Sequence, residues 1–249
     1  MSNDMTDTPS NLIVPDWPAP PGVKALVTTR QGGVSGGPWA TFNLAAHVGD
    51  DAAAVAANRA ALCRQLPAEP PWLSQVHGTL CVDAARVASG VEADASFTRQ
   101  RGVVCAVLTA DCLPLLLCDD QASVVAAVHA GWRGLADGVI EASVARLGVP
   151  GERLLAWLGP AIGPQAFEVG ADVRDAFLAH AAEAESAFTP LAADKWLCDL
   201  YQLARQRLAA LNVRRIASAD FCTVRDIDRF YSFRRDGVTG RMASCIWLA

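Results

Sequence analysis

Apolar stretches of two kinds follow one another along the chain: short runs dense in Val and Leu, and longer alanine-rich stretches. The short runs at 103–109, 114–118 and 123–129 are too brief for a typical helix, which predicts strands buried on both faces. Further strands are predicted at 24–30, 72–76, 80–84, 154–158, 215–217 and 242–248.

The longer stretches predict helices at 51–66, 135–147, 172–186 and 199–211. Asp50 or Asp51 can cap the first helix, which Pro67 ends, and Asp199 can cap the last. Strands and helices mix along the chain, and no repeat or linker divides it. We therefore predict a single domain of the α/β (or α+β) class with a large mixed sheet.

Composition limits the classes of partner. The chain has 249 residues, of which 52% are hydrophobic and 19% charged, and a net charge of −5. This is apolar enough for a sizeable core, and the absence of a basic cluster makes nucleic acid or an anionic membrane an unexpected partner. No segment reaches the roughly 18–20 apolar residues of a membrane helix. Small anionic substrates stay open, since a local group of arginines can bind them.

The chain start lacks the features of a secretory signal, so we expect residues 1–22 to be a flexible tail and 23–249 to be the folded, catalytic part. The eight cysteines contain no C-x-x-C pair, and most lie in apolar runs, which is typical of reduced thiols rather than of a disulfide framework. A cytoplasmic location is the simplest expectation.

Three residues with metal-binding side chains stand where predicted strands become loops: His77, Cys112 and His129. Two imidazoles and one thiolate can hold zinc and leave a fourth position for water or substrate, which is the pattern of catalytic zinc sites. The alternative is that each is an ordinary structural or core residue. Asp111 beside Cys112 disfavours a free thiolate, so a reactive Cys112 needs a cation nearby, either a metal ion or a protonated histidine.

The chain carries a series of motifs in a fixed order. They are Asn43-Leu44, His47-Val48-Gly49-Asp50, Asn58-Arg59, Gln75-Val76-His77-Gly78, Ala93-Asp94, Thr109-Ala110-Asp111-Cys112-Leu113-Pro114, His129-Ala130-Gly131-Trp132-Arg133-Gly134, Gly159-Pro160-Ala161-Ile162-Gly163-Pro164, Glu168-Val169-Gly170, Asp199-Leu200, Cys222-Thr223 and Phe230-Tyr231-Ser232-Phe233-Arg234-Arg235-Asp236-Gly237. This series resembles the YfiH family of laccase-domain proteins, formerly called multicopper polyphenol oxidases and now described as purine nucleoside phosphorylases. The likeness covers roughly 24–248.

The resemblance implies a layered α-β-β-α domain with zinc held by His77, Cys112 and His129. It also implies phosphorolysis of adenosine, inosine, guanosine and methylthioadenosine, with adenosine deamination as a further activity. Bacterial relatives have in addition been linked to editing of peptidoglycan precursors, by removal of a wrongly added L-serine from a UDP-muramic acid intermediate. The chain departs from the family pattern at Ala95, at 165–166 and at Ala204, which affects the expected substrate preference more than the metal.

The older oxidase description can be tested by counting ligands. A blue copper and a trinuclear cluster together need many more imidazoles than the four histidines of this chain. A multicopper mechanism is therefore not expected. A single Cu²⁺ in the His77–Cys112–His129 site is a second candidate metal, and it could give weak polyphenol oxidation.

Roles for other residues follow from their places in these motifs. Arg59 and Arg133 are candidates to neutralise phosphate, with a structural salt bridge as the alternative for each. Asn43 and His47 are candidates to line the pocket, although Asn43 could instead stabilise a turn. Asp111 is predicted to orient a ligand histidine, in preference to acting as a general base.

The tract 230–235 either stacks on a purine and closes the site or is a plain strand, and His180 is expected to be solvated. Two other classes of function remain. One is a metal-free cysteine hydrolase with Cys112 as nucleophile and His129 as base. The other is a non-catalytic cell-envelope or partner-binding factor. The sequence also leaves open a monomer or a homodimer.

Overall fold

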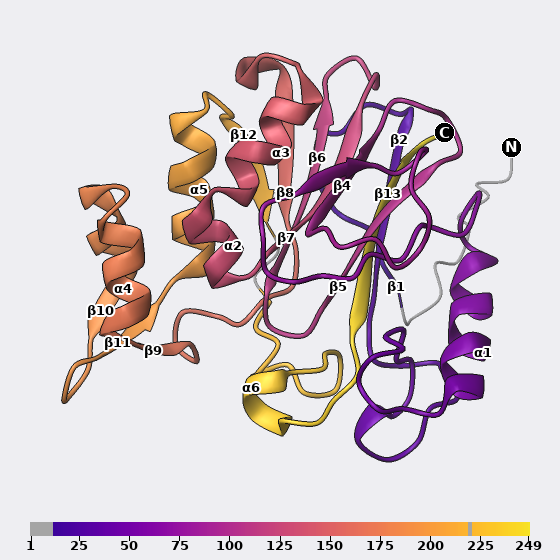
Figure 1. Ribbon diagram of the computed structural model, residues 1–249, viewed down its shortest axis with the longest axis horizontal. Helices are drawn as coiled ribbons and strands as arrows, with labels where there is room; N and C mark the ends of the chain where they lie inside the picture. The colour runs from indigo at the N-terminus through magenta and orange to yellow at the C-terminus, as the bar shows by residue number, and fades with distance from the viewer. Residues whose placement is uncertain (1–11, 219–220) are drawn as a thin grey trace, which may run out of the picture.

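Two β-sheets packed face to face form the centre of the computed structural model, which describes residues 12–218 and 221–249 (Figure 1). The larger sheet has the strand order β12-β8-β6-β7-β4-β3. Its strands β8, β6, β7 and β4 run antiparallel to their neighbours among themselves, while β12 and β3 join the two edges in parallel. The strands are β3 (Cys81–Asp83), β4 (Ala95–Thr98), β6 (Leu113–Asp119), β7 (Val125–Ala130), β8 (Leu154–Leu158) and β12 (Arg215–Ser218).

The smaller sheet is antiparallel throughout, in the order β1-β2-β13-β5. It consists of β1 (Leu12–Ile13), β2 (Val23–Thr28), β5 (Val104–Thr109) and β13 (Met242–Leu248). Strands predicted at 24–30, 103–109 and 242–248 are thereby confirmed, and the last of them lies between two strands from far earlier in the sequence.

The central strands are buried on both faces, as the sequence predicts. In β6, Leu115 and Leu117 pack under the helices, whereas Leu116 and Cys118 pack between the sheets. Strand β8 shows the same alternation, with Trp157 fully buried between the sheets. Side chains alternate between the two faces of a strand, and each face of these strands lies in a hydrophobic core. Apolar residues are therefore needed at every position, which explains the unbroken Val and Leu runs.

Helices form the two outer layers. The larger sheet is covered by α2 (Trp132–Asp137), α3 (Val139–Leu147) and α5 (Leu200–Ala210), and α1 (Ala52–Cys63) packs Leu62 against the smaller sheet (Figure 1). The α-β-β-α layering is thereby confirmed. Asp51 and Asp199 cap α1 and α5 through their side chains.

The remaining elements extend the fold at one side. A small sheet of β9 (Glu168–Gly170), β10 (Phe188–Pro190) and β11 (Lys195–Cys198) packs beside α4 (Ala171–Leu178), next to a 3₁₀ turn at Ala182–Ala187. The short helix α6 (Phe233–Asp236) lies at the lower side of the molecule in Figure 1. No helix within the described ranges is both long and apolar enough to cross a membrane.

Several expectations are wrong in detail. Residues 12–22 are not a tail, since β1 pairs with β2 and Trp17 packs on the core between the sheets; residues 1–11 lie outside the described part. The predicted helix 135–147 is two helices, broken at Gly138, whose φ of 99° interrupts the helical ladder. The predicted helix 172–186 ends at Leu178, and the tract 230–235 is not a strand. Ser74 makes one isolated bridge to Glu92, in place of the strand predicted at 72–76.

Candidate active site

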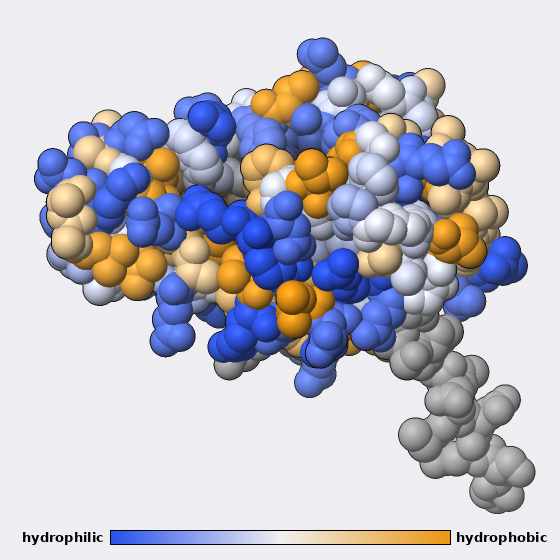
Figure 2. All heavy atoms as spheres, turned by 90° about the horizontal axis from the view of Figure 1, so that it is seen from below, coloured by the Kyte–Doolittle hydropathy of each residue, from blue (hydrophilic) through white to orange (hydrophobic). Residues whose placement is uncertain are grey.

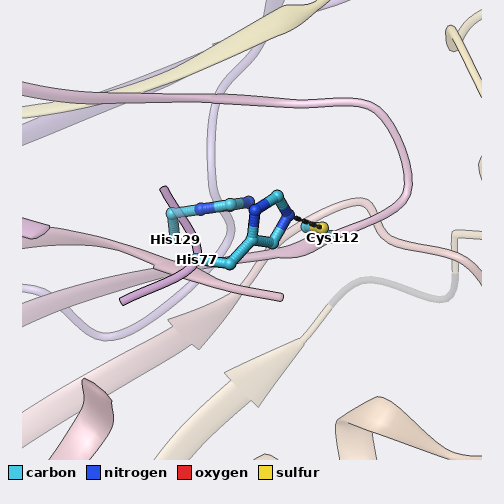
Figure 3. Close-up of side chains that lie close together, drawn as sticks. All are labelled: His77, Cys112 and His129. Atoms are coloured by element: carbon cyan, nitrogen blue, oxygen red, sulfur yellow. Dashed lines mark hydrogen bonds between the residues drawn. The ribbon is translucent and has the colours of Figure 1, made fainter. Parts of the chain in front are cut away.

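Three side chains from separate parts of the chain meet at one end of the larger sheet: His77, Cys112 and His129 (Figure 3). His77 comes from a loop, Cys112 from the link between β5 and β6, and His129 from the end of β7. One potential ligand atom from each lies within 4.8 Å of the other two. The Cys112 Sγ to His77 Nε2 distance is 3.7 Å.

This geometry fits a zinc ion. Typical bond lengths for Zn–S and Zn–N place sulfur and nitrogen about 3.6 Å apart on a tetrahedron, close to the observed separation of Cys112 and His77. The two imidazole rings lie edge to face, with centroids 4.8 Å apart and their planes inclined by 64°, and one ligand atom of each belongs to the cluster. Two nitrogens and one sulfur suit zinc, and a fourth position remains for a non-protein ligand.

Asp94 holds two of these ligands in place. Its buried carboxylate accepts a hydrogen bond from His129 Nδ1 at 2.8 Å, so that Nε2 is left to bind a metal. The same carboxylate accepts the backbone N–H groups of Val76, His77 and Gly78 at 3.2, 2.9 and 2.7 Å. Asp94 belongs to one of the sequence motifs, but the sequence does not indicate its role, because its four hydrogen-bond donors come from two segments distant in sequence.

The loops around the ligands have unusual backbone conformations. His77 has a φ of 61° and Asp111 a φ of 94°, values that few non-glycine residues adopt. Strain of this kind is held by the surrounding contacts and is common at functional sites. Gly131 leaves room for close approach: a Cβ there would lie 2.7 Å from His77 Cδ2 and 3.0 Å from Cys112 Sγ.

Charges within the cluster shift its protonation in the metal-free protein. Burial alone would raise the pKa of Cys112, but His129 and His77 outweigh it and lower that pKa to about 6. For His129, burial acts to lower the pKa, but Cys112 and Asp94 outweigh it and raise that pKa to about 9. The site thus favours a thiolate beside an imidazolium, and the thiolate is the form that binds metal.

A cavity of about 420 Å³ opens on the three ligands. This volume lies within the roughly 300–1,000 Å³ typical of small-molecule sites. Among the described residues, Asp111 is the one carboxylate in its lining. The lining also includes three arginines and three aromatic residues. They are Arg133, Arg234, Arg241, Trp132, Phe167 and Phe233. The lower face of the molecule, seen directly in Figure 2, likewise shows strongly hydrophilic residues beside apolar ones.

The structure separates the other predicted residues into two groups. His47 and Arg133 line the cavity, as expected of pocket residues. Arg59 does not: its Nε donates to the Leu44 carbonyl and its guanidinium lies over the Trp72 ring at 4.4 Å. Asn43 is also outside the lining, fully buried, and its amide bonds to the turn around Ala45. For Asn43 the turn-stabilising alternative is correct, and for Arg59 substrate contact is replaced by a structural role.

The prediction that Asp111 orients a ligand histidine is wrong, since Asp94 does so. Asp111 instead accepts hydrogen bonds from Thr223 Oγ1 at 2.5 Å and from the backbone N–H of Arg234 at 2.7 Å. It therefore ties α6 to the cavity wall. The tract 230–235 is divided: Phe230 and Tyr231 are fully buried, whereas Phe233 and Arg234 line the cavity.

Arg241 is a cavity residue that sequence reasoning missed. It lies immediately before β13, outside every motif, so no local signal marks it.

His180 is exposed, just after α4, as expected. His47, distant in sequence from the ligands, shares their cavity, but in the ranges 12–218 and 221–249 the three-residue cluster is the one group of donors able to hold a metal.

Residues 24–249 match the family model described as "Multi-copper polyphenol oxidoreductase laccase". The chain belongs to this family. It is 56% identical to a purine nucleoside phosphorylase of Pseudomonas aeruginosa, over 95% of this chain and 98% of the relative. It is 53% identical to the purine nucleoside phosphorylase YfiH of Escherichia coli K12, over 96% and 99% of the two chains.

Solved structures support the same assignment. A Neisseria meningitidis protein, 49% identical, superposes with a TM-score of 0.93 over 96% of this chain and 99% of that one. YlmD from Geobacillus stearothermophilus, 31% identical, gives a TM-score of 0.82 over 92% of each chain. The chain thus has the fold of an enzyme family with a site able to hold one metal ion, and the single donor group found among its described residues does not match the several coppers in the family's description.

Proposed function

We propose that this protein is a zinc-dependent purine nucleoside phosphorylase, acting on adenosine, inosine, guanosine and methylthioadenosine, with adenosine deamination as a second activity. The observation that carries the proposal is the convergence of His77, Cys112 and His129 on a cavity whose wall holds three arginines. Relatives that share more than half of their residues with this chain bear the phosphorylase name.

Zinc is the metal that the two-imidazole, one-thiolate set suits, and Cu²⁺ is the alternative ion for the same site. When bound, zinc supplies a Lewis acid that polarises a substrate oxygen and lowers the pKa of water. His77, Cys112 and His129 would hold it, and Asp94 would keep His129 in the required tautomer. The expected partners are a nucleoside and phosphate, in the cytoplasm.

In phosphorolysis, a phosphate oxygen forms a bond to the anomeric carbon of the pentose as the bond from that carbon to the purine nitrogen breaks. The electron pair of the broken bond stays with the purine, which takes up a proton from solvent, and a pentose 1-phosphate remains. Arg133 in the cavity wall provides positive charge for the phosphate. The rings of Trp132, Phe167 and Phe233 offer apolar faces for the purine.

In deamination, a water oxygen adds to the purine carbon that bears the amine, and ammonia leaves with a proton from that water. The three ligands and the aromatic rings line one cavity, so a purine stacked on those rings would lie in the same space as the ligands. Neutral His47 in the wall is a candidate to accept or return a proton, because burial, with help from Arg241 and Arg59, lowers its pKa.

A second candidate is hydrolysis by Cys112 without metal, with His129 as base, on substrates such as a peptidoglycan precursor carrying L-serine. The lowered pKa of Cys112 beside His129 favours this alternative. Activity that survives removal of the metal would identify it.

The test is purified protein of known metal content, incubated with inosine and phosphate. We expect free hypoxanthine and pentose 1-phosphate in equal amounts, and loss of both bound zinc and purine release in His77→Ala. His180→Ala, which changes an exposed histidine away from the cavity, is the matched control and should keep both. Unchanged purine release in His77→Ala would refute the proposal.

A further inference from the structure

Arg241 occupies a distinct position among the three cavity arginines. Arg133 and Arg234 are exposed, whereas Arg241 is partly buried, immediately before β13 in the smaller sheet. Arg133 and Arg234 lie on the short helices α2 and α6, whereas Arg241 directly precedes the inner strand β13, whose pairing with both β2 and β5 fixes the backbone there.

The backbone around Arg241 is bonded to the segment that carries His47. The Arg241 N–H donates to Asn43 Oδ1 at 2.9 Å, and the Leu44 N–H donates to the Arg241 carbonyl at 3.3 Å. The buried Asn43 side chain thus joins two parts of the chain nearly 200 residues apart. This contact brings the segment of His47 to the start of β13, and both His47 and Arg241 line the cavity.

The face of the Arg241 guanidinium lies over the Phe233 ring, 5.8 Å from its centroid, and one edge of the group is hydrogen-bonded to the protein, whereas the other edge has no hydrogen-bond partner among the described residues. Both protons of Nη1 are taken by the carbonyls of Thr239 and Gly240, at 2.9 and 3.0 Å. Within the described part of the chain, neither Nε nor Nη2 makes a hydrogen bond, and no carboxylate forms an ion pair with Arg241. The Nε–Nη2 edge is the one that binds two oxygens of a phosphate at once.

The charge of Arg241 acts on the metal site. Burial lowers the pKa of Arg241, while Cys112 and Asp111 raise it, so the guanidinium lies within electrostatic range of the ligand sulfur. An anion bound by Arg241 would lie in the same cavity of about 420 Å³ that the three candidate metal ligands line.

We infer that Arg241 forms the phosphate subsite of this cavity, with its Nε and Nη2 donating to two phosphate oxygens. The inference rests on the proposed phosphorylase function and assigns its anionic co-substrate to a residue outside the sequence motifs. Arg133 and Arg234 then add positive charge at the exposed rim. Phosphate held in this way has two oxygens left, one of which can face the anomeric carbon of a nucleoside in the cavity.

The experiment measures KM separately for phosphate and for inosine in the zinc-loaded enzyme and in Arg241→Gln, with zinc content determined for each. Two charge-assisted hydrogen bonds are lost, so we expect KM for phosphate to rise about 10- to 100-fold. KM for inosine should change less than about twofold, because the substitution weakens the binding of phosphate and not of the nucleoside. Adenosine deamination does not use phosphate, so this activity should persist. Arg241→Lys should recover part of the affinity, because it keeps the charge but not the two-point geometry.

Arg229→Gln is the matched control. The Arg229 guanidinium lies over the Phe221 ring at 4.7 Å, as that of Arg241 lies over Phe233 at 5.8 Å, but Arg229 is exposed and does not line the cavity. An unchanged KM for phosphate in Arg241→Gln, or an equal rise of both KM values, would overturn the inference while leaving phosphorolysis itself intact. Absence of phosphate-dependent purine release from the wild-type enzyme would instead overturn the proposed function.

A second measurement needs no variant and covers the case in which Arg241→Gln does not fold. Phenylglyoxal modifies accessible guanidinium groups, and mass spectrometry identifies the modified arginine. Inorganic phosphate should protect Arg241 in the wild-type protein and should leave Arg229 unprotected. Equal modification of Arg241 with and without phosphate would contradict the subsite.

Discussion

His129 Nδ1 donates to Asp94 Oδ1 over 2.8 Å, and both side chains are buried. The same carboxylate accepts three successive backbone N–H groups at 76–78, which carry the His77 side chain toward the site. A single residue therefore positions two of the three candidate metal ligands. Burial opposes ionisation of Asp94, but the hydrogen bonds from His129 and the backbone outweigh it and lower the pKa of Asp94, so it accepts all four hydrogen bonds as a carboxylate.

Asp94→Asn should weaken zinc binding by about 10- to 100-fold, the usual cost of losing such a contact. The amide has the size of the carboxylate, but its NH₂ group would face N–H donors of the 76–78 loop. Competition with a chromogenic chelator measures the affinity, and the Co²⁺-substituted protein reports ligand geometry by its absorption spectrum.

Asp175→Asn, at an exposed position on α4, serves as the control for that substitution. Its zinc affinity should equal that of the wild type. If Asp94→Asn also binds zinc with wild-type affinity and an unchanged Co²⁺ spectrum, Asp94 is not a positioning residue.

The sequence predicts the three ligands but not the residue that orients them. His77, Cys112 and His129 each stand where a strand becomes a loop, a local feature that hydrophobic pattern makes visible. Asp94 has no such mark, because its role depends on the pairing of β4 with β7, which brings it beside His129 across 35 residues of sequence. Arg241 is hidden for the same reason, since its neighbours at 43–47 are nearly 200 residues away.

The helix propensity of a segment can also be overridden by strand pairing with a distant part of the chain. The alanine-rich stretch 172–186 favours helix, yet the helix ends at Leu178 and Phe188 enters a strand paired with Cys198. Arg59 and Asn43 show a related limit for the site. Their motifs predict polar side chains near a pocket. In the folded protein, however, both side chains donate hydrogen bonds to backbone carbonyls, and the Arg59 guanidinium also stacks on Trp72.

Arg59→Ala should lower the free energy of unfolding by roughly 1–3 kcal/mol, through loss of the hydrogen bond to Leu44 and the stacking on Trp72. Because Arg59 does not line the cavity, KM for phosphate should stay within about twofold of the wild-type value. Urea denaturation and steady-state kinetics measure the two quantities. A large rise in KM with unchanged stability would restore Arg59 as a substrate-binding residue.

Cys112 should titrate at an unusually low pH in the metal-free protein. Its pKa is lowered from 9.0 to about 6, so the thiolate fraction, and with it the rate of alkylation, should rise as pH increases through about 6. Burial raises the pKa of Cys81 to about 11, and this thiol provides an internal comparison that stays protonated over the same range. Iodoacetamide labelling between pH 5 and 8, mapped by mass spectrometry, gives the profile.

Replacing His129 by Ala removes the main cationic neighbour of Cys112, so the midpoint of that profile should move to higher pH. Zinc should suppress labelling of Cys112 in the wild type by occupying the sulfur. A midpoint near 9 in the wild-type apoprotein would show that the histidines do not activate this thiol.

The backbone at Gly131 lies close to the side chains of His77 and Cys112, and a substitution there can show whether their observed positions are required. Its φ of −64° and ψ of 157° are accessible to alanine, so Gly131→Ala introduces no backbone strain at the start of α2. The new Cβ would meet His77 Cδ2 at 2.7 Å and Cys112 Sγ at 3.0 Å, forcing at least one ligand to move. Since a displacement of about 1 Å in a catalytic group can cost roughly 100-fold in rate, purine release should fall by that order, together with zinc affinity. Gly36→Ala, where nothing lies within 4 Å of the added Cβ, should preserve both. Wild-type zinc affinity in Gly131→Ala would mean that the ligands tolerate displacement and that the observed spacing is not needed to hold the ion.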